Sequence, residues 1–185
     1  PLASRCAFAM PSPAVGDIVK GNQVTYAGGR QVASPYGLAV EGNPSSACGS
    51  IPMDMSGTYQ ITLAFWLYWD TYANDDDLAF ELTANVNTNF GGFHFNVNTS
   101  SVAGSAMFYA VPDGSAQRGI AATRPSDGWH HWVITYDCNI AGTRGVIEID
   151  GVEASVTNFS TGFASTSPFV SSTLYLFSRA NTSLF

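Results

Sequence analysis

The stretch from Thr58 to Trp69, TYQITLAFWLYW, alternates between two kinds of side chain. Every second position holds a large apolar residue: Tyr59, Ile61, Leu63, Phe65, Leu67 and Trp69. Successive side chains of a β-strand point to opposite faces, so a period of two places this whole set on one face. The stretch therefore predicts a long strand whose apolar face packs in a core.

Shorter segments with strand composition follow along the chain, separated by clusters of Gly, Pro, Asn and Asp. They are Leu78–Ala84, Gly92–Val97, Ala106–Val111, Trp129–Tyr136, Val146–Ile149, Val152–Val156 and Thr173–Ser178, with weaker candidates at Gln23–Tyr26 and Gly37–Glu41. No stretch keeps a helical period for three turns. Many short strands divided by turns predict an all-β fold, a two-sheet antiparallel jelly-roll sandwich.

The composition narrows the class of protein. A chain of 185 residues has the length of one domain. Its net charge is -7 and Lys20 is the single lysine, so the clustered cations that a nucleic-acid site needs are missing. The longest apolar run, Leu63–Trp69, is far too short to span a membrane. A polar content made of Ser, Thr and Asn is typical of secreted, cell-surface and virion β-proteins, and we expect one of these locations.

Asp150 and Gly151 give the sharpest local signal. A two-residue type I′ turn needs positive φ at both central positions, and an Asp-Gly pair supplies it. A turn there places Ile149 opposite Val152 and Glu148 opposite Glu153. The apolar residues then share one face of the hairpin and the two glutamates share the other.

Residues 126–156 resemble the laminin-G-like domains of the concanavalin A-like lectin/glucanase superfamily. The stretch reads SDGWHHWVITYD, then a short loop, then GVIEIDGVEASV. The family shows a Trp-x-His strand that ends in Thr-Tyr-Asp, followed by a strand that enters a Val-Asp-Gly hairpin. The upstream YQITLAFWLYW and the downstream STLYLFSRAN are also similar to family strands. The resemblance implies the sandwich fold, with His131 as a core histidine.

The resemblance also suggests a domain layout. We expect residues 1–35 to form a partly extended N-terminal segment that packs on the sandwich or on a partner, and residues 36–185 to form the sandwich. The family's last strand is missing from this chain, so the segment Thr173–Phe185 is predicted to have an open sheet edge. A neighbouring subunit or domain, or the segment Asp17–Gly28, would cover that edge.

Glu148, Asp150 and Glu153 also resemble the E-x-D-x-x-E signature of laminarinase-type glycoside hydrolases. That chemistry needs the three acids on one continuous strand that lines a cleft. Asp150-Gly151 favours a turn instead, so we expect no enzyme activity and keep a glycoside hydrolase as the third hypothesis. The sequence has no nucleophile elbow, P-loop or HExxH motif.

The densest group of acids is Asp75, Asp76 and Asp77. Hard oxygen ligands on a loop suit Ca²⁺, which makes these residues a candidate metal site. A solvated loop between strands explains the same residues without a metal, and both interpretations stay open. Asp137 and Asn139 form a second, weaker candidate.

Aromatic residues suggest where a sugar could bind, because an exposed ring stacks on the apolar face of a pyranose. Trp69 and Tyr72 lie at a strand end beside the acid loop, while Trp129 and Phe65 are expected in the core. The candidate ligand-binding residues are Trp69, Tyr72, Asp75, Asp77 and Asn139.

These observations predict a non-catalytic recognition module of a secreted or surface protein, carbohydrate-binding or adhesive, with a glycan or a surface protein as partner. The alternative is a structural assembly protein, such as a virion decoration or fibre protein or a component of a cell-surface layer. Burial of loop aromatics in protein contacts would favour assembly, whereas an exposed groove with aromatics and acids would favour recognition.

Overall fold

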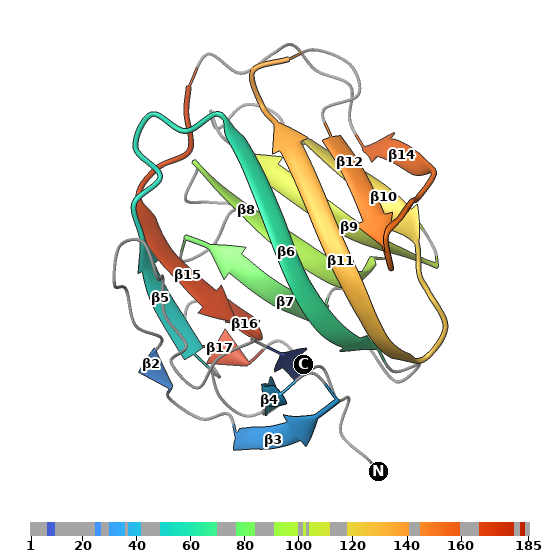
Figure 1. Cartoon of the computed structure of the whole chain (residues 1–185). Helices are drawn as coiled ribbons and strands as arrows, with labels where there is room; N and C mark the ends of the chain where they lie inside the picture. Colours follow the sequence, from blue (N-terminus) through green and yellow to red (C-terminus); the bar gives the residue numbers. More distant parts are fainter. Residues whose placement is uncertain are drawn as a thin grey trace.

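The computed structural model describes residues 7–9, 25–26, 30–35, 37–41, 49–69, 77–83, 91–99, 102, 104–111, 118–140, 145–159, 167–179 and 182–183. Every regular element within these ranges is a β-strand. The strands form two large antiparallel sheets, one behind the other in Figure 1, and a small two-stranded sheet of β16 (Ser178–Arg179) and β17 (Thr182–Ser183). The predicted all-β sandwich is therefore confirmed.

The first sheet has seven strands. Their order is β13 (Val152–Glu153), β12 (Gly145–Ile149), β11 (Gly128–Asp137), β6 (Gln60–Trp69), β1 (Ala7–Ala9), β4 (Gly37–Glu41) and β3 (Arg30–Ser34). The two ten-residue strands β6 and β11 pair along their whole length, from Gln60 opposite Asp137 to Trp69 opposite Gly128.

The second sheet has eight strands. Their order is β14 (Val156–Phe159), β10 (Arg118–Thr123), β9 (Ser105–Val111), β8 (Gly92–Thr99), β7 (Asp77–Leu82), β15 (Ser172–Leu176), β5 (Gly49–Met53) and β2 (Thr25–Tyr26). The described ranges contain no helix long and apolar enough to cross a bilayer.

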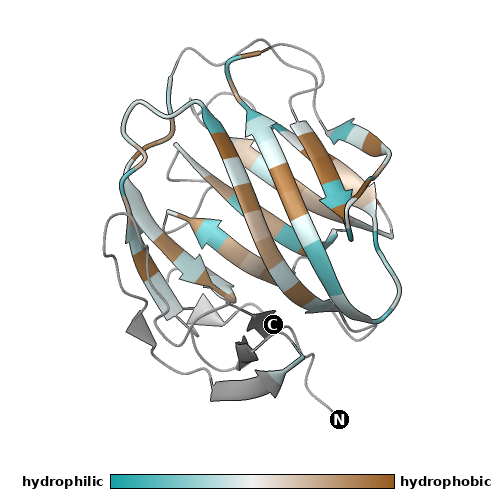
Figure 2. Ribbon diagram, in the orientation of Figure 1, coloured by the Kyte–Doolittle hydropathy of each residue, from teal (hydrophilic) through white to brown (hydrophobic). Residues whose placement is uncertain are grey.

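Aromatic rings from both sheets fill the space between them. The Phe65 ring of β6 lies 5.3 Å from that of Phe80 on β7, and Trp132 of β11 lies 5.2 Å from Phe95 on β8. Figure 2 shows the corresponding alternation of apolar and polar residues along β6 and β11. The buried residues of β6 are Ile61, Phe65 and Leu67, which confirms the apolar face predicted for this strand.

The outer faces of the two sheets differ. On the eight-stranded sheet the outer side chains His94, Met107 and Tyr109 are buried, and all eight residues of β8 are buried. His94 stacks on Tyr109 at 4.6 Å and lies 3.9 Å from the fully buried Glu81. The outer side chains of β6 and β11 on the seven-stranded sheet are exposed or half-buried. The outer face of the seven-stranded sheet is therefore the one on which a ligand can reach the side chains of the described central strands.

Three sequence predictions about the chain path are corrected. Val152–Val156 is not one strand, because the chain leaves the first sheet after Glu153 and pairs with β10 of the second sheet from Val156. The strand predicted at Thr173–Ser178 ends at Leu176, since Phe177 has a φ of 52°. That strand, β15, is also not an open edge, because it pairs with β7 on one side and β5 on the other. A contact between residues 173–185 and a neighbouring chain stays a prediction.

Part of the predicted N-terminal segment contributes to the sheets. The short strand β1 lies between β6 and β4, with Phe8 opposite Leu67. The strand β2 extends the other sheet beyond β5. The boundary at residue 35 stays a prediction. Cys138 is buried, and its Sγ donates to the Tyr59 carbonyl at 3.2 Å.

Candidate functional site

The outer side chains of β6, β11, β12 and β13 form the surface that we call the open face. Residues that pair across antiparallel strands share a face, so the register assigns its members. From β6 and β11 they are Gln60, Thr62, Ala64, Trp66, Tyr68, Trp129, His131, Val133, Thr135 and Asp137, and from β12 and β13 they are Val146, Glu148 and Glu153.

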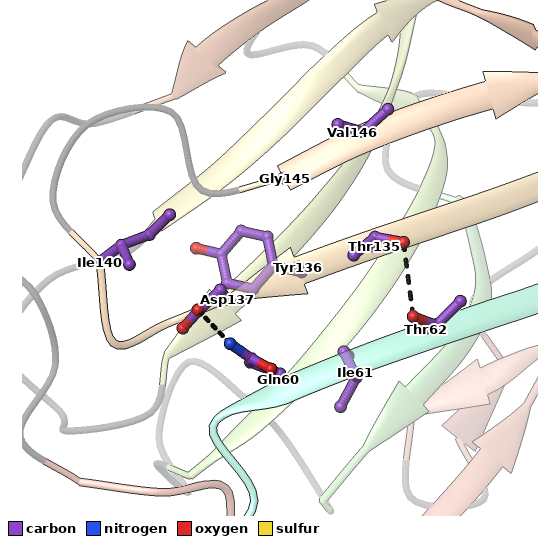
Figure 3. Close-up of a pocket in the computed structure, with 9 residues that line it drawn as sticks. All are labelled: Gln60, Ile61, Thr62, Thr135, Tyr136, Asp137, Ile140, Gly145 and Val146. Carbon is purple, nitrogen blue, oxygen red and sulfur yellow. Dashed lines mark hydrogen bonds between the residues drawn. The ribbon is translucent and has the colours of Figure 1, made fainter.

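One end of the open face contains a cavity of about 580 Å³, which we call the polar hollow. It lies where β6 and β12 begin and β11 ends, because these three neighbouring strands are antiparallel. Its lining is Gln60, Ile61, Thr62, Thr135, Tyr136, Asp137, Ile140, Gly145 and Val146 (Figure 3). This volume is within the range of roughly 300–1,000 Å³ that small-molecule sites occupy.

Hydrogen bonds fix the polar groups of the hollow. The Gln60 Nε2 donates to the Asp137 Oδ2 at 2.6 Å, and the Asn139 N–H donates to the Asp137 Oδ1 at 2.8 Å. The hydroxyls of Thr62 and Thr135 lie 3.4 Å apart across the two strands (Figure 3). A carboxylate offers about four lone-pair directions, so Asp137 can still accept from a ligand. Ile140, which is 43% exposed, adds an apolar rim.

Aromatic rings occupy the opposite end of the open face, and we call them the ring pairs. The rings of Trp66 and His131 lie 5.1 Å apart, and those of Tyr68 and Trp129 lie 5.6 Å apart. All four side chains are half-buried. The predictions of Trp129 and His131 as core residues are therefore wrong, because the buried core residues of β11, Trp132, Ile134 and Tyr136, point to the opposite face of the sheet. Phe65 is in the core, as predicted.

The hairpin at Asp150-Gly151 is confirmed. Asp150 has a φ of 54° and Gly151 a φ of 78°, and Ile149 pairs with Val152 while Glu148 pairs with Glu153. The backbone thus reverses between the two glutamates. The single extended strand that the E-x-D-x-x-E signature requires does not form here.

A histidine ties this turn to the neighbouring strand. The His130 Nδ1 donates to the Asp150 Oδ2 at 2.7 Å, and its Nε2 lies 2.8 Å from the Ser126 carbonyl oxygen. The His131 N–H donates to the Asp150 Oδ1 at 2.9 Å, and the Asp150 N–H donates back to the His131 carbonyl at 2.8 Å. Partial burial acts to raise the pKa of Asp150, but these hydrogen bonds and the charges of the two histidines outweigh it and lower the pKa from 3.8.

We expect Asp150→Asn to lower the free energy of unfolding by about 1 kcal/mol at neutral pH, because it removes charge-assisted hydrogen bonds from a side chain that solvent still reaches. Asn keeps the positive φ accessible. Since the folded-state pKa of Asp150 is lowered, its contribution is present above the ordinary pKa of 3.8 and is lost as the pH falls through the folded value. Urea unfolding at neutral and acidic pH measures the difference between the proteins.

Glu153→Gln is the matched control, because Glu153 is an exposed acid in the same hairpin. We expect its effect to stay within about 0.5 kcal/mol at either pH. A gap between wild type and Asp150→Asn that stays constant down to the acid limit would contradict the role given to the Asp150 carboxylate.

Two of the candidates named from the sequence, Trp69 and Asn139, lie at opposite ends of β6. Trp69 closes the strand opposite Gly128, whereas Asn139 follows the pair of Asp137 and Gln60 at its start. Nine residues of strand separate the two ends by roughly 30 Å. Tyr72, Asp75 and Asp76 and the side chains of Trp69 and Asp77 lie outside the described residues.

The described residues do not test the predicted calcium site either. The described part of the chain contains no group of three or more His, Cys, Asp or Glu side chains placed to hold a metal ion. The acid group at Asp75, Asp76 and Asp77 falls outside that part, apart from the Asp77 backbone at the start of β7. A calcium site there stays a prediction.

A family model described as "Laminin_G_3: Concanavalin A-like lectin/glucanases superfamily" matches residues 43–180. The chain belongs to this superfamily. The match includes β6, β11 and the hairpin, from which the open face is built. Searches of curated proteins and of solved structures found no match. Laminin-G-like domains are usually non-catalytic, although the superfamily includes glycosidases.

The polar hollow is the part of the site that sequence reasoning missed. Gln60 and Thr62 are on the mixed face of the predicted strand, and the sequence suggests Asp137 only as a loop ligand for calcium. These residues meet because Gln60 pairs with Asp137 and Thr62 with Thr135, and local alternation does not specify which strands pair.

Proposed function

We propose that the chain is a non-catalytic recognition module of a secreted or surface protein, and that it binds carbohydrate through the polar hollow. The observation that carries this proposal is the chemistry of the lining. A fixed carboxylate, a side-chain amide and two hydroxyls lie beside the apolar Ile140 and Val146. A pyranose presents the complementary surface, with hydroxyls that donate and accept around its edge and an apolar face of C–H groups.

The same lining supports binding without hydrolysis. Among the described residues that line the hollow, Asp137 is the one carboxylic acid. Hydrolysis of a glycosidic bond by the usual mechanisms needs two carboxyl groups that flank it. Glu148 and Glu153 pair with each other further along the open face, outside the lining of the hollow.

An array of immobilised glycans tests the proposal, followed by calorimetric titration of the glycans retained. We expect the double variant Thr62→Val/Thr135→Val to bind the selected glycan roughly 30-fold more weakly. Two hydrogen bonds of about 1 kcal/mol each are lost while the side-chain volume is kept.

Thr157→Val is the control, because Thr157 is an exposed threonine on β14 of the other sheet. Its affinity should equal that of the wild type. An array without any bound glycan, or a double variant that binds as tightly as the wild type, would refute carbohydrate binding at the hollow.

A further inference from the structure

Three triplets of the sequence match the acceptor pattern for N-linked glycosylation, which is Asn-x-Ser/Thr with x other than Pro. They begin at Asn98, Asn158 and Asn181. Patterns this short also occur by chance in a chain rich in Ser, Thr and Asn, so the fold has to distinguish between them. An N-linked glycan is bulky and hydrated, and it therefore needs an asparagine whose side chain reaches solvent.

The setting of Asn98 leaves no room for a glycan. This residue is only 9% exposed on β8, a strand whose eight residues are all buried. The Asn98 N–H donates to the Asn96 Oδ1 at 3.1 Å, and Asp77 of β7 lies opposite in the sheet. A sugar on the Asn98 amide would have to displace the groups that cover β8. Asn181 lies outside the described residues.

Asn158 lies in the opposite kind of environment. It is exposed on β14, the last strand in the order of the eight-stranded sheet (Figure 1). Its partner across the sheet is Ile120 of β10, and β10 is the one neighbour of β14 among the described strands. Thr157 on the same strand and the preceding Ser155 are exposed as well. A glycan on Asn158 can therefore extend into solvent without displacing a core residue.

The composition of β14 gives such a glycan a role. An edge strand presents backbone groups that can pair with another chain, and charged side chains or proline commonly prevent this. The sequence of β14, VTNF, contains neither a charged residue nor a proline. A bulky, hydrated glycan on this strand would keep a second chain away from the edge, as charge does on other edge strands.

Resting on the secreted or surface location in the proposed function, we propose that Asn158 carries an N-linked glycan that shields the β14 edge, and that Asn98 carries none. The donor is an oligosaccharide linked to a polyprenyl diphosphate. The Asn158 Nδ2 forms a bond to the anomeric carbon of the first sugar as the bond from that carbon to the diphosphate oxygen breaks. The diphosphate leaves with the electron pair of the broken bond, and the amide loses one proton to a base of the transferase.

Mass spectrometry of the full chain secreted from cultured mammalian cells tests the modification. The three acceptor sites fall in separate tryptic peptides, which span residues 31–118, 145–179 and 180–185. Release of N-linked glycans by peptide-N-glycosidase F in heavy-oxygen water converts each glycosylated Asn into a labelled Asp. We expect label in the 145–179 peptide and none in the 31–118 peptide. Asn158→Gln and Ser160→Ala remove the acceptor in two different ways and should abolish the label, whereas Ser160→Thr is the matched control that keeps it.

Light scattering of the same purified proteins tests the shielding. We expect the wild type and Ser160→Thr to remain monomeric, whereas Asn158→Gln and Ser160→Ala should associate increasingly as their concentration rises. Unglycosylated variants that stay monomeric would overturn the shielding.

An unlabelled 145–179 peptide, or label in the 31–118 peptide, would overturn the assignment of the glycan to Asn158. The glycan array reports on the polar hollow independently of this label. Loss of carbohydrate binding at the hollow and loss of the Asn158 glycan are therefore distinguishable results.

Discussion

Trp132→Ala should lower the free energy of unfolding by about 3–5 kcal/mol, the usual cost of removing a large buried aromatic side chain. Trp132 is fully buried, and its ring contacts Phe95 of the opposite sheet at 5.2 Å. The substitution leaves a cavity between the two sheets that rigid strands cannot close. For a domain of this size we expect the melting temperature to fall by roughly 10 °C, measured by circular dichroism.

Two control variants show whether this loss comes from the core. Trp66→Ala removes the same side chain one strand away, but Trp66 is half-buried on the open face, so it should cost less than half as much. Trp132→Phe keeps an aromatic ring, and the indole Nε1 that it removes has no hydrogen-bond partner among the described residues. Equal losses for Trp66→Ala and Trp132→Ala would mean that the two faces of the sheet are assigned wrongly.

Gly145→Ala should destabilise the protein by about 1–3 kcal/mol, because no space exists for a methyl group at this position. A Cβ there would lie 2.3 Å from the Thr135 carbonyl oxygen and 2.9 Å from the Ile120 Cδ1. The carbonyl belongs to the paired strand β11 and cannot move without disturbing the sheet. Gly145 also lines the polar hollow, so we expect weaker glycan binding as well, measured by urea unfolding and calorimetry.

Ala64→Val provides the comparison for added bulk in the same sheet. Ala64 is exposed on the open face, and a β-branched side chain is favourable in a strand. We therefore expect Ala64→Val to change the free energy of unfolding by no more than about 0.5 kcal/mol. If Gly145→Ala were as mild as Ala64→Val, the close approach of β12 and β11 at Gly145 would be contradicted.

Local sequence patterns predicted the elements in which apolar residues recur with a regular period or in which a turn-forming pair ends a strand. The alternation around Phe65 gave the buried face of β6, and Asp150-Gly151 gave the turn and the register of its hairpin. The strands β1, β3, β5, β10 and β17 had no such pattern and were missed. Half of the residues of β10 are Gly or Ala, and β5 contains Pro52, which argues against a strand.

The candidate site was harder to predict because it depends on pairing between distant segments. Alternation shows that Trp129 and Trp132 point to opposite faces, but it does not show which face is the core. The polar hollow joins Gln60 of β6 to Asp137, 77 positions later in the chain. Only the register of β6 against β11 and of β11 against β12 brings this amide, this carboxylate and Val146 to one place.

A crystal structure of the protein with the tightest glycan from the array tests binding at the polar hollow most directly. We expect a sugar ring seated between Gln60, Thr135 and Val146, with a hydroxyl donating to the carboxylate of Asp137. A glycan bound instead by residues 69–77, or on the eight-stranded sheet, with the hollow empty, would contradict this expectation.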